Sequence, residues 1–311
     1  MSTQPSSPAA VGTLHGVALL SHLGVIQIEG EDAAKFIHGQ LTHDFALLDL
    51  NNARLAAFCS AKGRMQASFI GFKRPTGEIL LVCSMDLLAL TLKRLSMFVM
   101  RAKAKLSDAT DRYSICGLSG DATKNVAIHA DSVWSKADLD TESVIQLYPA
   151  DGTPRQLWIA PVGTPAPQGA PMALDTWLWG EVRSGVATLN QAVFEAFVPQ
   201  MLNYESVGGV NFKKGCYPGQ EVVARSQFRG TLKRRAFVVH SQGMLQAGQE
   251  IFTPADATQP VGTVVQAAMA PGGGMDAIVS LQLSALEAGP LLAADSTLQV
   301  LPLPYPLLDD I

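Results

Sequence analysis

Hydrophobic residues in this chain come in short runs that are interrupted by glycine, proline or charge. Even Ile79–Cys83 is flanked by charged residues within a few positions, and no run approaches the roughly 20 apolar residues that a membrane-spanning helix needs. Hydrophobic residues make up 48% of the chain and charged residues 16%, with 27 glycines and 18 prolines. This composition is typical of a packed, turn-rich globular protein. At 311 residues the chain is longer than most single cores, so we expect two or three domains.

Residues 1–11 are rich in serine, proline and alanine. They lack the basic start and the apolar segment of a secretory signal, so we expect a disordered tail and a cytoplasmic location. The folded part is therefore expected to begin near residue 12.

Residues 12–235 are predicted to alternate between strands and helices. Apolar residues at helical spacing predict helices that begin near Ala33, Leu87 and Leu174, the last one following a Pro/Gly-rich linker at residues 161–171. Alternating or continuous apolar runs predict strands at Val25–Ile28, Leu55–Cys59, Arg64–Phe72, Ile79–Cys83, Tyr113–Leu118, Val144–Leu147 and Gln156–Ala160.

Residues 236–311 have a different pattern, in which short strands are separated by glycine or proline turns. The predicted strands are Ala236–His240, Glu250–Phe252, Val261–Gln266, Ala277–Leu283 and Leu298–Leu301. Such spacing predicts a small antiparallel β-barrel. The predicted fold class is α+β, with mixed or antiparallel sheets that carry helices and a C-terminal barrel.

The four cysteines never form a C-x-x-C pair, and the six histidines show no metal-ligand spacing. This argues against a structural zinc site or a four-thiolate iron–sulfur cluster held by this chain alone, so we predict no metal site. Cys59, Cys83 and Cys116 lie in apolar, strand-like segments, where cysteine behaves as a small hydrophobic residue. Cys216 differs, because its neighbours are polar or glycine.

The segment around Cys216 has the features of a reactive thiol. Pro218 suits the first position of a helix that would run through Glu221 to Arg225, and two lysines precede the cysteine. A helix N-terminus and nearby cations both favour the thiolate form. The alternative is a glycine turn with a packed cysteine and solvated lysines, and spacing alone favours that alternative.

Two more observations concern possible ligands. Gly215 and Gly219 would let the backbone approach a ligand closely, and Gln220 with Glu221 could hydrogen-bond a planar heterocycle. Residues 213–235 carry a local net charge of +6 against −10 for the rest of the chain, which indicates an anionic partner or, equally, a solvated basic face. No Ser/His/Asp arrangement or phosphate-binding loop accompanies them, so hydrolase and metalloenzyme functions are disfavoured.

The segment from Lys213 to Arg225, KKGCYPGQEVVAR, is similar to the K-G-C-[FY]-x-G-Q-E signature of the YgfZ family. Other segments that resemble this family cover most of the chain, at residues 39–44, 61–65, 197–200, 203, 208–209, 228–230, 233–234 and 303–306.

The resemblance implies a three-domain ring like that of the glycine-cleavage aminomethyltransferase, with tetrahydrofolate bound at its centre. It implies an accessory factor for assembly or maintenance of iron–sulfur enzymes, including those that modify tRNA, with tRNA affected indirectly. A true aminomethyltransferase is the alternative, and a folate-independent thiol redox protein is a third class. Whether the protein turns over a substrate stays open.

The resemblance also implies site residues. Cys216 is the working thiol, and a pterin would stack on Trp177, although a core tryptophan is an equally good interpretation from the residues alone. Leu23 stands where the family has a second tryptophan. The implied folate contacts are Trp177, Gln200, Asn203, Lys214, Gly215, Tyr217, Gly219, Gln220, Glu221 and Arg225, and the basic residues near them would suit the glutamyl carboxylates of folate.

Overall fold

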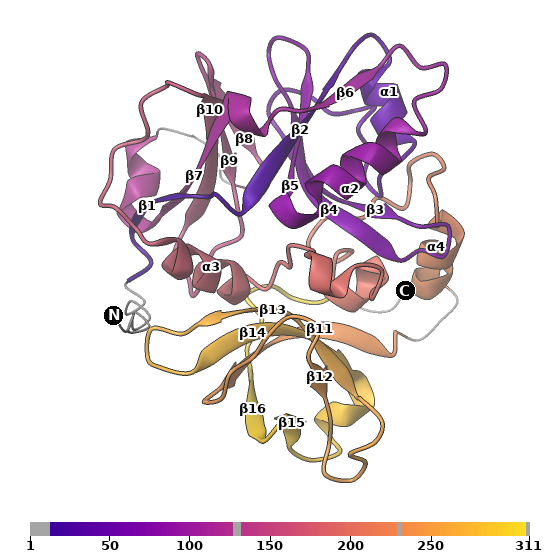
Figure 1. Ribbon diagram of the computed structural model, residues 1–311, viewed down its shortest axis with the longest axis vertical. Helices are drawn as coiled ribbons and strands as arrows, with labels where there is room; N and C mark the ends of the chain where they lie inside the picture. Colours follow the sequence, from indigo (N-terminus) through magenta and orange to yellow (C-terminus); the bar gives the residue numbers. More distant parts are fainter. Residues whose placement is uncertain (1–12, 127–131, 229–231, 309–311) are drawn as a thin grey trace, which may run out of the picture.

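The computed structural model describes residues 13–126, 132–228 and 232–308, so the predicted tail lies outside the described residues. Three antiparallel sheets form three lobes, two above and one below in Figure 1. Short helices pack on the sheets or lie in the segments that connect them. The predicted α+β class is confirmed.

The first sheet, at the upper left of Figure 1, has the strand order β1-β7-β10-β9-β8. Its strands are β1 (Gly16–Leu19), β7 (Tyr113–Ser119), β8 (Lys136–Leu139), β9 (Glu142–Gln146) and β10 (Arg155–Pro161). The short helices η1 (Thr110–Arg112) and η2 (Gly120–Asn125) flank β7. Because β1 pairs with β7, the chain visits this lobe, leaves it for the second sheet and returns.

The second sheet, at the upper right, has the order β3-β4-β5-β2-β6. Its strands are β2 (Leu23–Glu29), β3 (Ala53–Cys59), β4 (Met65–Lys73), β5 (Ile79–Ser84) and β6 (Lys105–Asp108). Helices α1 (Ala33–His38) and α2 (Met85–Ser96) pack on it. Leu88 and Leu95 of α2 lie on one helical face and are buried against this sheet, as their spacing predicts.

The third sheet is the C-terminal lobe, with the order β12-β13-β14-β11-β16-β15. Its elements are β11 (Arg234–Ser241), β12 (Glu250–Ile251), β13 (Gly262–Met269), β14 (Met275–Gln282), η5 (Leu283–Leu286), β15 (Leu291–Ala293) and β16 (Ser296–Leu301). Phe252 and Leu292 exchange two backbone hydrogen bonds of 2.9 Å, which join the two edges of the sheet. The predicted small barrel is therefore nearly closed.

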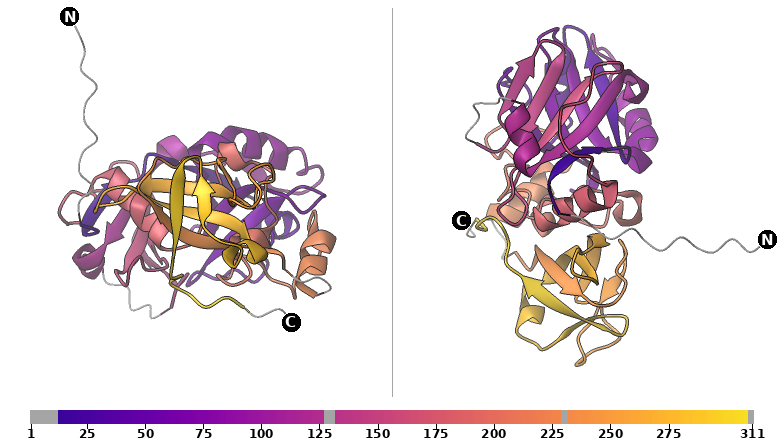
Figure 2. Two further views of the ribbon diagram at one scale, coloured as in Figure 1. Left: turned by 90° about the horizontal axis from the view of Figure 1, so that it is seen from below. Right: turned by 90° about the vertical axis from the view of Figure 1, so that its left-hand side faces the viewer.

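The remaining elements belong to the segment that connects the first sheet to the barrel. They are α3 (Leu174–Arg183), η3 (Gln191–Val193), η4 (Pro199–Leu202) and α4 (Gln220–Phe228). Helix α3 contacts β13 and β14, and Figure 2 shows it between the upper lobes and the barrel. Helix α4 lies on the opposite side of the molecule from α3 in Figure 1. None of the described helices is long and apolar enough to span a membrane.

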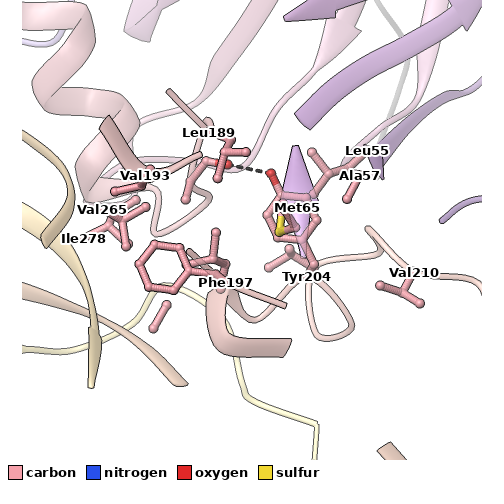
Figure 3. Close-up of a cluster of buried hydrophobic side chains, with 14 of the residues drawn as sticks. Leu55, Ala57, Met65, Leu189, Val193, Phe197, Tyr204, Val210, Val265 and Ile278 are labelled. Atoms are coloured by element: carbon pink, nitrogen blue, oxygen red, sulfur yellow. Dashed lines mark hydrogen bonds between the residues drawn. The ribbon is translucent and has the colours of Figure 1, made fainter. Parts of the chain in front are cut away.

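A shared hydrophobic core joins the second sheet, the connecting helices and the barrel. Figure 3 shows Met65 of β4, Phe197 and Tyr204 of the connecting segment, and Val265 of β13 in this cluster. The buried Tyr204 hydroxyl donates a 2.7 Å hydrogen bond to the Ala187 carbonyl, so its polar end is satisfied. Burying a large apolar side chain contributes about 1.5–3 kcal/mol, so this core stabilises the arrangement of the lobes.

The structure differs from the sequence prediction in two ways. Strands β1, β6, β8 and β15 are not predicted, because three or four residues are too few for an alternating pattern. The prediction that Pro218 is the first residue of a helix is wrong, since α4 begins at Gln220. Gly219 has a φ of +80°, which a right-handed helix cannot include, so the helix starts after it.

Candidate functional site

A cavity lies where the first sheet, the second sheet and α3 meet. About 590 Å³ there is not filled by protein atoms, and this volume includes space that is open to solvent. Its walls are largely apolar and aromatic, and they include Leu23, Leu55, Trp134, Arg155, Trp177 and Glu181. Pockets of this kind, with few polar groups in apolar walls, are typical of small-molecule sites.

Trp177 forms part of this wall and is almost fully buried, with 1% of its surface exposed. Its indole lies against Gly117 of β7, where an added Cβ would come within 2.4 Å of the ring. Glycine is therefore required at position 117 for the indole to reach the sheet. Leu23 lines the same cavity, so the two positions that the resemblance assigns to folate stacking do lie together.

Arg155, the first residue of β10, lies over the Trp177 ring with its guanidinium carbon 4.1 Å from the ring centroid. The stacking partner of Trp177 in this structure is therefore a cation. Burial lowers the pKa of Arg155 to about 10, and the negative charge of Glu181 opposes this shift. The guanidinium stays protonated at neutral pH.

Glu181 follows Trp177 by one helical turn and is also buried. Its carboxylate accepts hydrogen bonds from the indole Nε1 of Trp177 at 2.8 Å and from Nε2 of Gln266 at 2.9 Å, and it lies 3.2 Å from Nε2 of His22. Burial by itself would raise the pKa of Glu181, but the contact with His22, the charge of Arg155 and the indole hydrogen bond together lower it. The cavity thus holds an ionised carboxylate beside a cation. Because Gln266 belongs to β13, this network also ties the barrel to the cavity.

The signature segment lies elsewhere, between η4 and α4. Cys216 is exposed, whereas Cys59, Cys83 and Cys116 are buried, as the sequence predicts. Because α4 begins at Gln220, Cys216 precedes the helix by four residues rather than adjoining it. The enhanced thiolate character that the sequence suggests stays a prediction.

Lys214 anchors this segment. Its Nζ donates hydrogen bonds to the carbonyl oxygens of Leu41, at 2.7 Å, and of His38, and it lies 4.6 Å from the centroid of the Tyr217 ring. Burial lowers the pKa of Lys214 to about 8, against the opposing charges of Asp44 and Cys216. Lys214, a predicted folate contact, therefore hydrogen-bonds to protein carbonyl oxygens in this structure.

The glycines and amides of the signature also have protein partners. A Cβ on Gly219 would come within 2.4 Å of the Ser60 carbonyl oxygen, so the close neighbour of this glycine is the β3–β4 turn. Gln200 Nε2 donates to the Val223 carbonyl at 2.7 Å. Asn203, at a φ of +58°, forms two hydrogen bonds with the backbone of Ala236, at 2.9 and 3.1 Å. Gln200 and Asn203 are fully buried and hold α4 and the barrel in place.

The predicted folate contacts do not gather in one site. Trp177 lines the cavity, but none of the other contacts predicted between Gln200 and Arg225 is among its lining residues. At the surface, Glu221 and Arg225 form an exposed i,i+4 ion pair of 3.3 Å. Arg229 of the basic segment lies outside the described residues. For these residues a role in folate binding stays a prediction.

Sequence reasoning missed the two charged groups of the cavity, Arg155 and Glu181. The available signal was a charged residue at the start of an apolar strand, in Arg155-Gln156-Leu157-Trp158, and a carboxylate four residues after Trp177. Neither pattern is specific, because such residues are usually exposed.

No family model matches the chain. It is 30% identical to tRNA-modifying protein YgfZ of Colwellia psychrerythraea over 233 residues, which covers 72% of this chain and 71% of that protein. The chain belongs to the YgfZ family. A second YgfZ relative, from Cronobacter sakazakii, is 28% identical and covers 97% of each chain. The family resemblance inferred from the signature is thus confirmed.

The fold of this YgfZ-family chain is similar to that of the glycine cleavage system aminomethyltransferase T from Bartonella henselae. The TM-score is 0.66 at 15% identity, covering 93% of this chain and 86% of that one. At this identity the similarity concerns the fold, and it confirms the predicted likeness to the aminomethyltransferase.

Proposed function

We propose that this YgfZ-family chain is a tetrahydrofolate-binding accessory factor for the assembly or maintenance of iron–sulfur enzymes, including enzymes that modify tRNA. The observation that supports this most is the presence of two distinct features, a cavity between the lobes and an exposed thiol outside it. A bound small molecule and a protein client could then be engaged at the same time. tRNA would be affected indirectly, through the client enzymes, which we expect in the cytoplasm.

The residues of the cavity fit a folate ring. Leu23, Leu55 and Trp134 supply apolar and aromatic surface for a planar heterocycle, and Arg155 and Glu181 supply a donor and an acceptor for its polar edge. When bound, tetrahydrofolate would supply a carrier for one-carbon units. The protein residues would bind and orient the ring and exclude water from it.

The position of Cys216 suits contacts with partner proteins. Its segment is tied to the second lobe through Lys214, so the thiol is presented on an anchored loop. A thiolate is both a nucleophile and an iron ligand, so this position suits transient contact with a client protein or an assembly protein.

Calorimetric titration of the purified protein with tetrahydrofolate tests the ligand, and restoration of iron–sulfur enzyme activity in cells that lack the native gene tests the role. We expect saturable one-to-one binding and restored activity. Failure to bind tetrahydrofolate at millimolar concentration would refute the folate part of the proposal.

An aminomethyltransferase of the glycine-cleavage type is the second candidate, and the fold similarity favours it. Incubation with an aminomethylated lipoyl carrier and tetrahydrofolate separates the two functions. Robust formation of methylenetetrahydrofolate and ammonia would replace the first proposal by this one, whereas an accessory factor produces neither.

A further inference from the structure

Arg155 is a buried cation that the rest of the protein does not satisfy. Only 3% of its surface is exposed, and its Nε has no hydrogen-bond partner. Across the described residues, its guanidinium donates no hydrogen bond to any backbone or side-chain acceptor. Its contacts are the Trp177 ring and the charge of Glu181. A guanidinium has five N–H donors, and an unpaired donor that is buried away from water, as Nε is, costs free energy.

Glu181 does not resolve this deficit, because its oxygens already have other partners. Oε1 is contacted by His22 and Trp177, and Oε2 accepts from Gln266. A carboxylate offers about four acceptor positions, so Oε2 has room for about one more donor. The cavity therefore presents free donors from Arg155 and a free acceptor from Glu181.

We propose that Arg155 recognises the ligand of this cavity by donating hydrogen bonds to a ring oxo group of a planar heterocycle. The inference rests on the proposed function and deepens it. The 4-oxo group of a reduced pterin is an acceptor beside N–H donors on the same ring edge, which matches Arg155 beside Glu181. A free carboxylate of the ligand would instead lie near the Glu181 charge and be repelled. The structure thus assigns the ring, and not the glutamyl tail, to Arg155.

The main comparison uses calorimetric titration of two ligands with three proteins. The ligands are tetrahydrofolate and its 4-amino analogue, which presents a donor where tetrahydrofolate presents the oxo acceptor. The proteins are the wild type, Arg155→Met and the control Arg74→Met. Arg74 is also a buried arginine stacked near an aromatic ring, that of Tyr113, but it does not line the cavity.

We expect the wild type to prefer tetrahydrofolate over the 4-amino analogue by about 10–100-fold, the range of a hydrogen bond to a charged group. Arg155→Met should weaken tetrahydrofolate binding by a similar factor and reduce the preference, of which a part remains because the 4-amino analogue also lacks the N3 hydrogen that Glu181 would accept. Arg74→Met should retain both. Arg155→Met keeps much of the side-chain volume but removes the positive charge that helps to lower the pKa of Glu181, so circular dichroism and urea denaturation check that the variant is folded.

The outcomes separate this inference from the function on which it rests. If the wild type binds no tetrahydrofolate, both fail. If the wild type binds tetrahydrofolate but Arg155→Met keeps the full affinity or the full preference over the 4-amino analogue, Arg155 does not hydrogen-bond the oxo group. The inference alone then fails. A tetrahydropterin without the glutamyl tail is the third ligand. If Arg155→Met weakens the binding of tetrahydrofolate but not of this fragment, Arg155 contacts the tail, and the proposal is overturned.

Discussion

Trp177 and Glu181 are joined by a 2.8 Å hydrogen bond from the indole Nε1 to the carboxylate Oε1. They lie one turn apart on α3, so a single helix presents an aromatic ring and a negative charge to the same cavity. Together with His22 and Arg155, the bond helps to lower the pKa of this buried carboxyl group. A change at either residue is therefore expected to alter both stability and ligand binding.

Trp177→Phe tests this pair. Phenylalanine keeps an aromatic ring but removes the N–H, so Glu181 loses one donor while it stays buried. We expect the free energy of unfolding to fall by about 1–3 kcal/mol and tetrahydrofolate affinity to fall by about tenfold. Urea denaturation and calorimetry measure the two effects. Trp177→Ala is less suitable, because the void left by removing the indole lowers the free energy of unfolding by about 3–5 kcal/mol.

Trp158→Phe is the matched control. Trp158 is buried in β10, and its Nε1 donates to Glu142 Oε2 at 2.7 Å, but it does not line the cavity. We expect a similar loss of stability with unchanged folate affinity. Equal loss of affinity in both variants would mean that the effect at Trp177 comes from general destabilisation.

Cys216→Ser should separate function from fold. The thiol is exposed, so we expect the free energy of unfolding to change by less than about 0.5 kcal/mol and tetrahydrofolate affinity by less than about 1 kcal/mol. In cells that lack the native gene, the variant should restore little thiomethylated tRNA or iron–sulfur enzyme activity, because serine cannot supply a thiolate. Full restoration at an equal protein level, checked by immunoblot, would show that the thiol is dispensable.

Lys214→Met should loosen the signature segment. The change removes donors to the carbonyl oxygens of His38 and Leu41, so we expect a loss of about 1–3 kcal/mol in the free energy of unfolding. Urea denaturation measures this loss. Lys213→Met is the control, because Lys213 is exposed and its change should stay within about 0.5 kcal/mol. A stable Lys214→Met protein would contradict the anchoring role.

His43 makes the protein sensitive to acid. Burial, with a further contribution from the charge of Arg54, lowers the pKa of His43 to about 4, and its Nδ1 accepts a 2.8 Å hydrogen bond from the Asp44 N–H. Between pH 6.5 and 4 the unfolded chain binds a proton at His43 that the folded protein does not. Stability from this residue is therefore lost as the pH falls through that window, by about 2–3 kcal/mol at pH 4.

Urea denaturation at pH 7, 5.5 and 4 measures this effect. His43→Asn retains an acceptor without the titrating ring, so its stability should decline less than that of the wild type. His15→Asn is the control, since His15 is exposed and also accepts a backbone N–H, that of Asp121. Identical acid profiles for wild type and His43→Asn would exclude His43 as the source.

Local patterns in the sequence were sufficient for much of the fold. The β3–β4 hairpin, the buried face of α2 and the C-terminal barrel follow from apolar residues at period 2 or 3.6 and from glycine turns. The exposure of Cys216 follows from its polar surroundings. These features depend on residues that are close in the sequence, so the sequence predicts them.

Tertiary contacts decided the rest. Gly219 takes a positive φ beside the Ser60 carbonyl, and this moves the start of α4 to Gln220. Arg155 of the first sheet stacks on Trp177 of α3, and Glu181 accepts a hydrogen bond from Gln266 of the barrel. The cavity and its charges are made by segments far apart in the chain. Their chemistry depends on burial and on partners that no local pattern encodes, which is why the sequence predicted Trp177 and Cys216 but placed neither the cavity nor its cation.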